Sequence, residues 1–418
     1  MEPTLRVVRA MLPVSRAAHF ARWADNIAMV KPNSRMRSGA LLIMSRIAGL
    51  NAGPRRRLVP MPAVLVALGL SFTVANDARG QGLAPCTTAT SACTEWIGLG
   101  AGPQRVLVYR SYPLDVATRS ITRALILVHG GGRNATETFN TAAAAAFLAG
   151  GLNDTVLIVP RFASNTGAAC GDALAPLEAN WGCEDRQADS WRNGSTAINN
   201  EKLTSYDFVD EILRKLARKD VFPSIQGVVI AGHSGGGQFA LRYAMASEAP
   251  DKLGLSTTYV VANADAMIYF DGLRPTAAAY PATAAAPGYA LPPPADPFVP
   301  FADARNCGAF DNWPYGLQSR TGYSAPWTSE QLKRRLSTRS VTYLLGGLDI
   351  FPIAGFDGTC PAMAQGPTRL ARGIAFNKYL NEKYGAHHKT EVVLTCGHND
   401  RCLFTASTGF PLLFPKPQ

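Results

Sequence analysis

The chain has 418 residues, of which 47% are hydrophobic and 17% charged, and its formal net charge is +11. This composition is that of a globular protein with ample apolar material for a core. Residues 1–80 hold twelve Lys and Arg against three acidic residues, a balance of 12 − 3 = +9, so the rest of the chain carries only 29 − 27 = +2. A nearly neutral body removes the main support for nucleic-acid binding.

The basic head has the parts of an export signal. Three arginines at 55–57 precede an apolar run at 61–74, and small and polar residues follow. This order is typical of a signal peptide, and a run of roughly 14 residues is shorter than the about 20 that a membrane helix needs. We expect residues 1–80 to be an export region, with translation starting at Met36 or Met44, and the mature protein to be secreted without a stable membrane anchor. A retained anchor is the alternative, and the sequence does not distinguish the periplasm from the medium.

All eight cysteines lie beyond this head. An even number of cysteines in an exported chain predicts disulfides. Proximity in the chain suggests three pairs, which leaves a fourth: Cys86–Cys93, Cys170–Cys183, Cys396–Cys402 and then Cys307–Cys360. A zinc site is the alternative, but the chain has no CxxC or Cys/His spacing typical of zinc.

Beyond residue 95, short apolar runs alternate with segments of helical periodicity. The runs are apolar at nearly every position, which predicts strands covered on both faces, at 125–128, 156–159, 228–231, 258–261, 341–345 and 392–394. Helices are expected at 205–216, 237–247 and 369–383. This alternation predicts one α/β domain over residues 81–418 with a mostly parallel sheet.

One Pro- and Ala-rich stretch, at about 273–327, breaks the alternation and has no clear periodicity. A loop of this length inside a domain is usually functional or disordered. Its position between two late strands favours a cap or lid over an apolar cleft, as do the aromatic residues Phe298, Phe301, Phe310, Trp313, Tyr315 and Trp327. A flexible surface insertion is the alternative.

Gly232-His233-Ser234-Gly235-Gly236 lies between an expected strand and an expected helix. A nucleophile on a tight strand-to-helix turn needs small neighbours, and the N-terminus of the following helix favours developing negative charge. We predict that Ser234 is a nucleophile. The alternative is a Gly-rich turn with an incidental serine.

A second glycine motif, His129-Gly130-Gly131-Gly132, follows the strand at 125–128. Consecutive glycines let backbone N–H groups approach an anionic oxygen, as in the oxyanion loop of esterases. The expected donors are the N–H groups of Gly131 or Gly132, together with that of Gly235. A phosphate-binding loop is the rival, but no Lys-Ser/Thr follows.

Elimination among the six histidines points to His398 as the base, because it follows the carboxyl end of the strand at 392–394. Asp349 follows the strand at 341–345 and is the expected acid, with Asp265 as a fallback and Asp357 a weaker one. The chain order Ser234, Asp349, His398 is the order of triads in this type of fold. His129 and His233 belong to the glycine motifs, whereas His387 and His388 precede their strand.

These motifs resemble those of the α/β-hydrolase superfamily, and among its members the chain is most similar to secreted microbial esterases near the polyhydroxyalkanoate-depolymerase and feruloyl-esterase branches. The resemblance spans residues 125–398 and implies a serine esterase that acts on a small or polymeric carboxylic ester and needs no metal or other cofactor. A secreted serine peptidase or acyltransferase with the same triad is one rival, and a non-catalytic binding protein on the hydrolase fold is another.

A loop after the strand at 156–159 contains Trp181, Cys183 and Trp191. Its position predicts that it borders the site. Two interpretations stay open, an acyl or aromatic subsite and a packed surface loop. The oligomeric state is not indicated.

Overall fold

The computed structural model describes residues 83–416 except 168–169, 184–188, 290–295 and 354, so the expected export region at 1–80 lies outside the described residues. An eight-stranded sheet has the strand order β1-β2-β4-β3-β7-β8-β11-β12. Its strands are β1 Thr94–Gly98, β2 Arg105–Arg110, β3 Arg123–Val128, β4 Thr155–Pro160, β7 Gly227–His233, β8 Thr257–Ala262, β11 Ser340–Gly346 and β12 Lys389–Val393.

The sheet is mostly parallel, as predicted. From β4 to β12 all neighbouring strands pair parallel, whereas the β1–β2 and β2–β4 pairs are antiparallel. Every residue of β4 is buried, as the continuous apolar run indicates for a strand covered on both faces. The α/β class with a mostly parallel sheet, which the alternating pattern predicts, is therefore confirmed.

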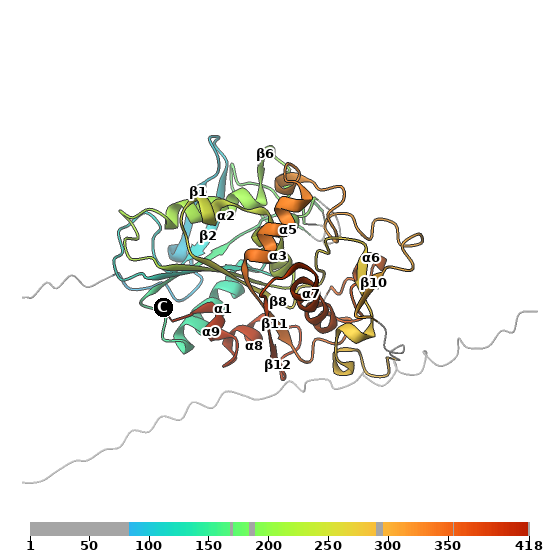
Figure 1. Ribbon diagram of the computed structural model, residues 1–418. Helices are drawn as coiled ribbons and strands as arrows, with labels where there is room; N and C mark the ends of the chain where they lie inside the picture. Colours follow the sequence, from blue (N-terminus) through green and yellow to red (C-terminus); the bar gives the residue numbers. More distant parts are fainter. Residues whose placement is uncertain (1–82, 168–169, 184–188, 290–295, 354, 417–418) are drawn as a thin grey trace, which may run out of the picture. The chain divides into compact units, whose positions relative to one another are not determined.

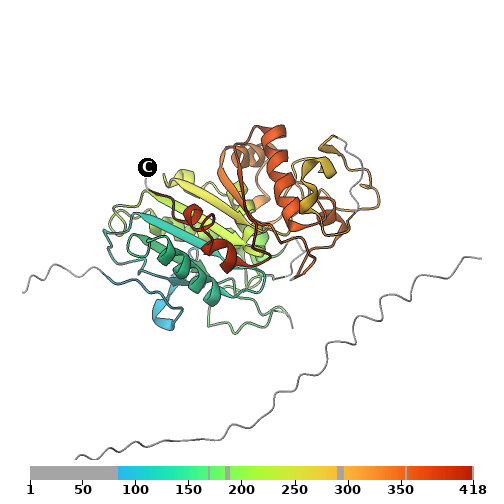
Figure 2. The ribbon, with the colours of Figure 1, turned by 90° about the horizontal axis from the view of Figure 1, so that it is seen from below.

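Helices cover both faces of the sheet (Figures 1 and 2). They are α1 Ala135–Leu148, α2 Ser205–Leu216, α3 Gly235–Ala246, α4 Ala249–Lys252, α5 Ser329–Thr338, α6 Cys360–Met363, α7 Arg369–Tyr384, α8 Asp400–Thr405 and α9 Phe410–Leu413. In the part of the chain that the structure describes, five short 3-10 turns lie at Ser91–Cys93, Trp191–Asn193, Ala277–Ala279, Ala282–Ala284 and Gly322–Ser324. Two small hairpins complete the described elements, β5 Thr196–Ala197 with β6 Asn200–Thr204, and β9 Leu273–Pro275 with β10 Phe298–Pro300.

The period of two along β3 divides the core into two layers. Ile126 and Val128 pack into one cluster with side chains of α2, α3 and α7, whereas Leu125 and Leu127 pack into a second cluster with side chains of α1, α8 and α9. Because both layers are apolar, the sheet is held from both sides. The carboxyl ends of its parallel strands then form one rigid edge.

The Pro- and Ala-rich segment at 273–327 has more structure than its sequence suggests. It contains the β9–β10 hairpin and several short turns. Phe298 and Trp313 are 5% and 4% exposed and belong to the main hydrophobic cluster. At these two positions the expectation of aromatic side chains over an apolar cleft is wrong, because they complete the core instead.

All four expected disulfide pairs are confirmed, namely Cys86–Cys93, Cys170–Cys183, Cys307–Cys360 and Cys396–Cys402. Their Cα–Cα separations run from 5.6 to 6.4 Å, within the usual range for a disulfide. Within the described residues, no helix is long and apolar enough to cross a membrane.

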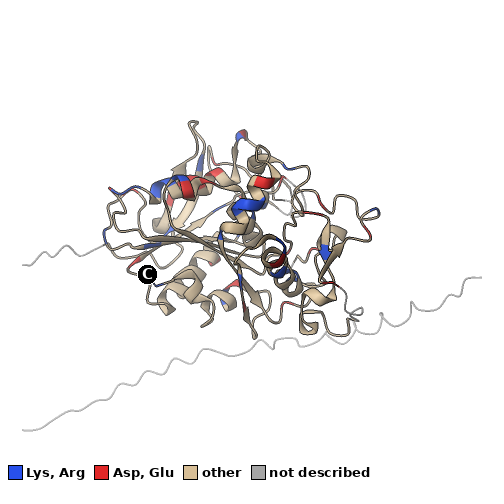
Figure 3. Ribbon diagram, in the orientation of Figure 1, with Lys and Arg blue, Asp and Glu red and all other residues tan. Residues whose placement is uncertain are grey.

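Basic and acidic residues occur on the same helices (Figure 3). Glu211 and Arg214 pair on α2, and Glu330 and Lys333 pair on α5. These pairs follow the i,i+3 spacing at which opposite charges meet on a helix. Both helices therefore mix the two signs on their exposed faces.

Candidate active site

Ser234 occupies a sharp turn between β7 and α3. Its backbone has φ 56° and ψ −118°, a conformation that a residue with a side chain rarely adopts. The turn closes tightly, since a Cβ on Gly236 would overlap the backbone oxygens of Val128 and His129. The glycine at 236 is therefore required by the close approach of β3, and the turn presents Ser234 at the carboxyl edge of the sheet.

Ser234, His398 and Asp349 form a continuous hydrogen-bonded chain. The Ser234 Oγ lies 3.0 Å from Nε2 of His398, and Nδ1 of His398 lies 2.7 Å from Oδ2 of Asp349. A carboxylate only accepts hydrogen bonds, so Nδ1 donates to Asp349 and Nε2 accepts from the serine hydroxyl. The structure thus brings together the three residues that the sequence singled out, although 164 residues separate the first from the last.

The loops that carry Asp349 and His398 touch through their backbones. A Cβ on Gly346, at the end of β11, would lie 2.6 Å from the carbonyl oxygens of Cys396 and Gly397. Only glycine allows this approach. The Cys396–Cys402 disulfide and the Asn399 side chain, which accepts from the Cys402 N–H at 2.8 Å, brace the His398 loop further.

Asn263, which the sequence analysis did not single out, links the same two loops. It follows β8, is fully buried and has a positive φ of 41°. Its Nδ2 donates to the Gly397 oxygen at 3.0 Å, and its Oδ1 accepts from the Gly346 N–H at 2.8 Å. A buried carboxamide satisfied by two backbone partners holds both loops in register. An asparagine directly after a strand at this edge was the one available signal.

His129 anchors the glycine loop that follows β3. Its ring is completely buried, and its Nε2 accepts from the Phe162 N–H at 3.2 Å. Nδ1 then carries the proton and donates to the Gly130 oxygen at 2.9 Å. Burial lowers the pKa of His129 to about 4, so the ring stays neutral. This histidine is therefore a structural anchor of the loop.

The glycine loop and Ser234 share one pocket of about 340 Å³. Its lining residues among those described are Gly130, Gly131, Gly132, Arg192, His233, Ser234, Gln238, Asp265, Gly355 and His398. The expected donors Gly131 and Gly132 belong to this lining, whereas Gly235 lies buried directly behind Ser234. Four lining side chains are polar and at least nine-tenths buried, so the pocket wall is polar.

Arg192 was also missed by the sequence analysis. It is 4% exposed, lines the pocket, and packs so close to Gly235 that a Cβ there would lie 2.5 Å from its Nε. Its neighbour Trp191 and the more distant Trp181 are both fully buried. The packed interpretation of the tryptophan loop is therefore correct for these two rings. What the loop contributes to the pocket is the arginine.

The fallback acids have other partners. Asp265 lines the pocket, but its Oδ1 lies 2.5 Å from Nε of Arg369. Asp357 accepts a hydrogen bond from the Tyr315 hydroxyl at 2.7 Å. Burial raises the pKa of Asp265, and Arg369 and Arg372 oppose that rise. Neither carboxylate lies on His398, which is bound by Asp349.

The other histidines occupy structural positions. His388 is buried, with its ring nitrogens near the Tyr343 hydroxyl and the Leu336 oxygen, and His387 is exposed. The His233 ring lies 4.5 Å from the His398 ring. Burial lowers the pKa of His233 well below its usual value, and the neighbouring His398 and Arg369 lower it further. His233 is therefore a neutral packing partner of His398.

Across the described part of the chain, no group of three or more His, Cys, Asp or Glu is placed to hold a metal ion.

Comparison with known proteins identifies the family. A family model described as the alpha/beta hydrolase family matches residues 125–407, and the chain belongs to this family. Among curated proteins no relative matches at a significant level.

The chain is also similar to solved structures at low sequence identity. Poly(aspartic acid) hydrolase-1 from Sphingomonas sp. KT-1 is 20% identical, with 79% of this chain and 100% of that chain covered and a TM-score of 0.51. LpqC, a poly(3-hydroxybutyrate) depolymerase from Bordetella parapertussis, is 18% identical, with coverages of 75% and 85% and a TM-score of 0.48.

Proposed function

We propose that this member of the alpha/beta hydrolase family is a secreted serine hydrolase of carboxylic esters, with Ser234 as nucleophile, His398 as base and Asp349 as acid. The observation that carries the proposal is the chain of hydrogen bonds from Ser234 Oγ through His398 to Asp349, at 3.0 and 2.7 Å. It ends at a serine in the strained turn that exposes a nucleophile.

The reaction proceeds in two halves. Ser234 Oγ attacks the ester carbonyl carbon while His398 Nε2 takes the hydroxyl proton, and Asp349 stabilises the imidazolium. The tetrahedral intermediate collapses, the alcohol leaves with the proton from His398, and an acyl-Ser234 remains. Water then attacks the acyl group with His398 again as base, which releases the acid and restores the serine.

The oxyanion is assigned to backbone donors next to Ser234. Gly131 or Gly132 supplies one N–H and Gly235 the other, at the N-terminus of α3, where the helix dipole also favours negative charge. The guanidinium of Arg192 against Gly235 adds positive potential to the same corner of the pocket. Removing one oxyanion donor typically costs about 100- to 1000-fold in rate.

Secretion is supported by the four disulfides, because disulfides persist in oxidising compartments. The basic and apolar order of residues 1–80 supplies the export signal. Fusing residues 1–80 to a reporter enzyme tests this part, and retention of the reporter in the cytoplasm would contradict it.

The catalytic proposal is tested by covalent labelling and a substrate panel. A fluorophosphonate should label Ser234, located by peptide mass spectrometry. The panel comprises p-nitrophenyl esters of rising chain length, a feruloyl ester, a polyester film and a matched p-nitroanilide. Hydrolysis of esters but not of the anilide is expected. Labelling at another residue, or faster hydrolysis of the anilide, would contradict the assignment and favour a peptidase.

A further inference from the structure

Arg369 lies behind the acid of the candidate triad. It is the first residue of α7, and its side chain is completely buried. Its Nη1 lies 3.4 Å from Oδ1 of Asp349 and donates to the Ile353 oxygen at 3.0 Å. Burying a guanidinium costs free energy unless nearby carboxylates balance its charge. The role of Arg369 therefore depends on which carboxylates are its counter-ions.

The two oxygens of the Asp349 carboxylate have separate partners. Oδ2 accepts from His398 at 2.7 Å, and Oδ1 faces Arg369. The distances differ, with the histidine contact the shorter by 0.7 Å. Arg369 therefore fixes the carboxylate plane without replacing His398 as its principal partner.

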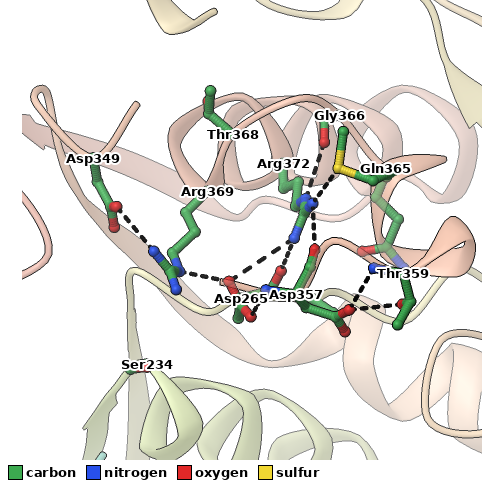
Figure 4. A network of polar contacts seen from close by, with 12 residues as sticks. Ser234, Asp265, Asp349, Asp357, Thr359, Gln365, Gly366, Thr368, Arg369 and Arg372 are labelled. Carbon is green, nitrogen blue, oxygen red and sulfur yellow. Dashed lines mark hydrogen bonds and ion pairs between the residues drawn. The ribbon is translucent and has the colours of Figure 1, made fainter. Parts of the chain in front are cut away.

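Asp265 is the stronger counter-ion of Arg369. Its Oδ1 lies 2.5 Å from Arg369 Nε, and its Oδ2 accepts from the Asp357 N–H at 2.6 Å. Arg372, one turn further along α7, donates to the Asp265 main-chain oxygen at 2.5 Å. Figure 4 shows the resulting row of Asp349, Arg369, Asp265 and Arg372, with Asp357 beside them. Asp265 is thus held rigidly from three sides.

The formal charges of this buried group favour a cation at His398. Asp265 and Asp349 face Arg369, and Arg372 donates to the Asp357 main-chain oxygen and interacts electrostatically with the Asp357 carboxylate. Two arginines and three acids give 2 − 3 = −1. Protonation of His398 during catalysis brings the sum to zero. This net charge depends on both partners of the Arg369–Asp265 ion pair. Removing either residue alone changes the net charge next to Asp349 by one unit.

We propose that Arg369 and Asp265 are positioning residues for Asp349. Arg369 holds the Asp349 oxygen that His398 leaves free, and Asp265 neutralises Arg369 so that its charge does not draw Asp349 away from His398. This inference rests on the proposed function, in which Asp349 orients His398. It assigns to Asp265, which lines the pocket, a role in the triad without contact to His398.

Several other charged or titratable groups surround His398. Asp349 and His233 face its ring directly, Asp400 on α8 interacts with it electrostatically, and Arg192 lines the same pocket. None of these four residues is itself replaced in the Arg369 and Asp265 variants. A change in His398 titration in such variants therefore reports the ion pair.

The test is the pH profile of kcat/KM for a soluble p-nitrophenyl ester, whose acidic limb reports the base of the free enzyme. Arg369→Met removes a positive charge and should raise the pKa of the acidic limb. Asp265→Asn removes a negative charge and should lower it. Shifts of about half a unit or more are expected from charges at this range. In the double variant the pKa of the acidic limb should return toward the wild-type value, because one positive and one negative charge are removed together.

The kinetic constants separate positioning from substrate binding. Arg369→Met should lower kcat by about 10- to 100-fold, as expected when a catalytic group is misplaced by a fraction of an ångström to one ångström, with KM changed by less than about threefold. Arg369→Lys keeps the charge but not the fork that reaches both carboxylates. It should keep the wild-type acidic limb with an intermediate kcat.

A matched control is Arg335→Met, which removes another largely buried arginine–carboxylate pair, with Glu248 at 2.5 Å, outside the pocket lining. It should leave the acidic limb unchanged. If a variant is too unstable for kinetics, a ¹⁵N-histidine NMR titration of folded protein in the Ser234→Ala background measures the His398 pKa directly. Shifts of the same sign in the two single variants, or none, would overturn the inference.

Failure of this inference is distinguishable from failure of the proposed function. Fluorophosphonate labelling at Ser234 tests the function alone. With labelling intact, unchanged acidic limbs and unchanged kcat in both single variants would reject only the positioning role. Without labelling at Ser234 the proposed function itself is rejected.

Discussion

One wall of the pocket is built from backbone, and the other from side chains that come from distant segments. The serine wall consists of Gly130–Gly132, Ser234 and Gly235, and its geometry comes from tight turns and an anchored loop. On the histidine wall Asp265 and His398 line the pocket, and Asn263, Asp349 and Arg369 support them from behind. Hydrogen bonds and ion pairs between three loops and helix α7 hold this wall.

The difference shows two ways to make a site rigid. On the serine wall, a close approach of backbones requires glycine, and substitution there meets steric overlap. On the histidine wall, buried polar groups must satisfy one another, and the loss of one partner leaves another unpaired. We therefore expect substitutions on the serine wall to abolish activity, and substitutions on the histidine wall to lower activity by different amounts.

The largest effect is expected on the serine wall. Ser234→Ala should lower kcat for ester hydrolysis by about a million-fold, as removal of a triad serine does in a well-studied protease. Circular dichroism and thermal unfolding should remain near wild type. Ser256→Ala, an exposed serine whose carbonyl oxygen binds the other end of β7, is the control and should keep full activity. Activity in Ser234→Ala above about one per cent would contradict the nucleophile.

On the histidine wall, Asp349→Asn should preserve the shape but reverse the hydrogen-bonding preference at His398 Nδ1. A change of this kind lowers kcat by about 10⁴-fold in a protease triad. Asp265→Asn should cost far less, because Asp265 contacts Arg369 and not His398. Steady-state kinetics of both variants compares the two carboxylates. The reverse order of effects would show that Asp265 is the acid.

Asn263→Ala should cause an intermediate loss. Both backbone links to Gly346 and Gly397 disappear, so the Asp349 and His398 loops lose their register. We expect kcat to fall by about 10- to 100-fold and the free energy of unfolding to fall by about 1–3 kcal/mol.

Asn381→Ala is the matched control for Asn263, because Asn381 also makes two hydrogen bonds to backbone, both to His388. It should lose similar stability while keeping activity. Equal losses of activity in the two variants would show that Asn263 acts only through global stability.

The smallest effect is expected from the Cys396–Cys402 disulfide, which braces the His398 loop. Replacing both cysteines by serine should lower activity by roughly three- to tenfold through looser positioning. Replacing Cys86 and Cys93 is the control, because that disulfide closes a loop of similar length, with sequence separations of 7 and 6. Both pairs should lose about 2 kcal/mol of stability on loop-entropy grounds. An equal loss of activity in both variants would contradict a specific brace.

Much of the serine wall could be predicted because its constraints are local. Gly232 to Gly236 must be small for the turn to close, and an apolar strand before it and a helix after it mark its place. The disulfide pairs could be predicted for a similar reason, since three of them join cysteines at most 13 residues apart. Cysteines that lie close together in the sequence have few alternative disulfide partners.

The sequence by itself determined the parallel α/β sheet, the turn at Ser234 and the candidate acid and base at strand ends, because hydrophobic periodicity and glycine spacing express backbone constraints directly. Only the tertiary structure decided that Asn263 links two loops, that Arg369 lies between Asp349 and Asp265, and that Arg192 enters the pocket beside the buried Trp191. These assignments depend on which side chains meet across strands and helices up to 134 residues apart. The sequence does not show whether an arginine or asparagine lies in a buried ion pair or on the exposed surface, because tertiary packing determines its partners.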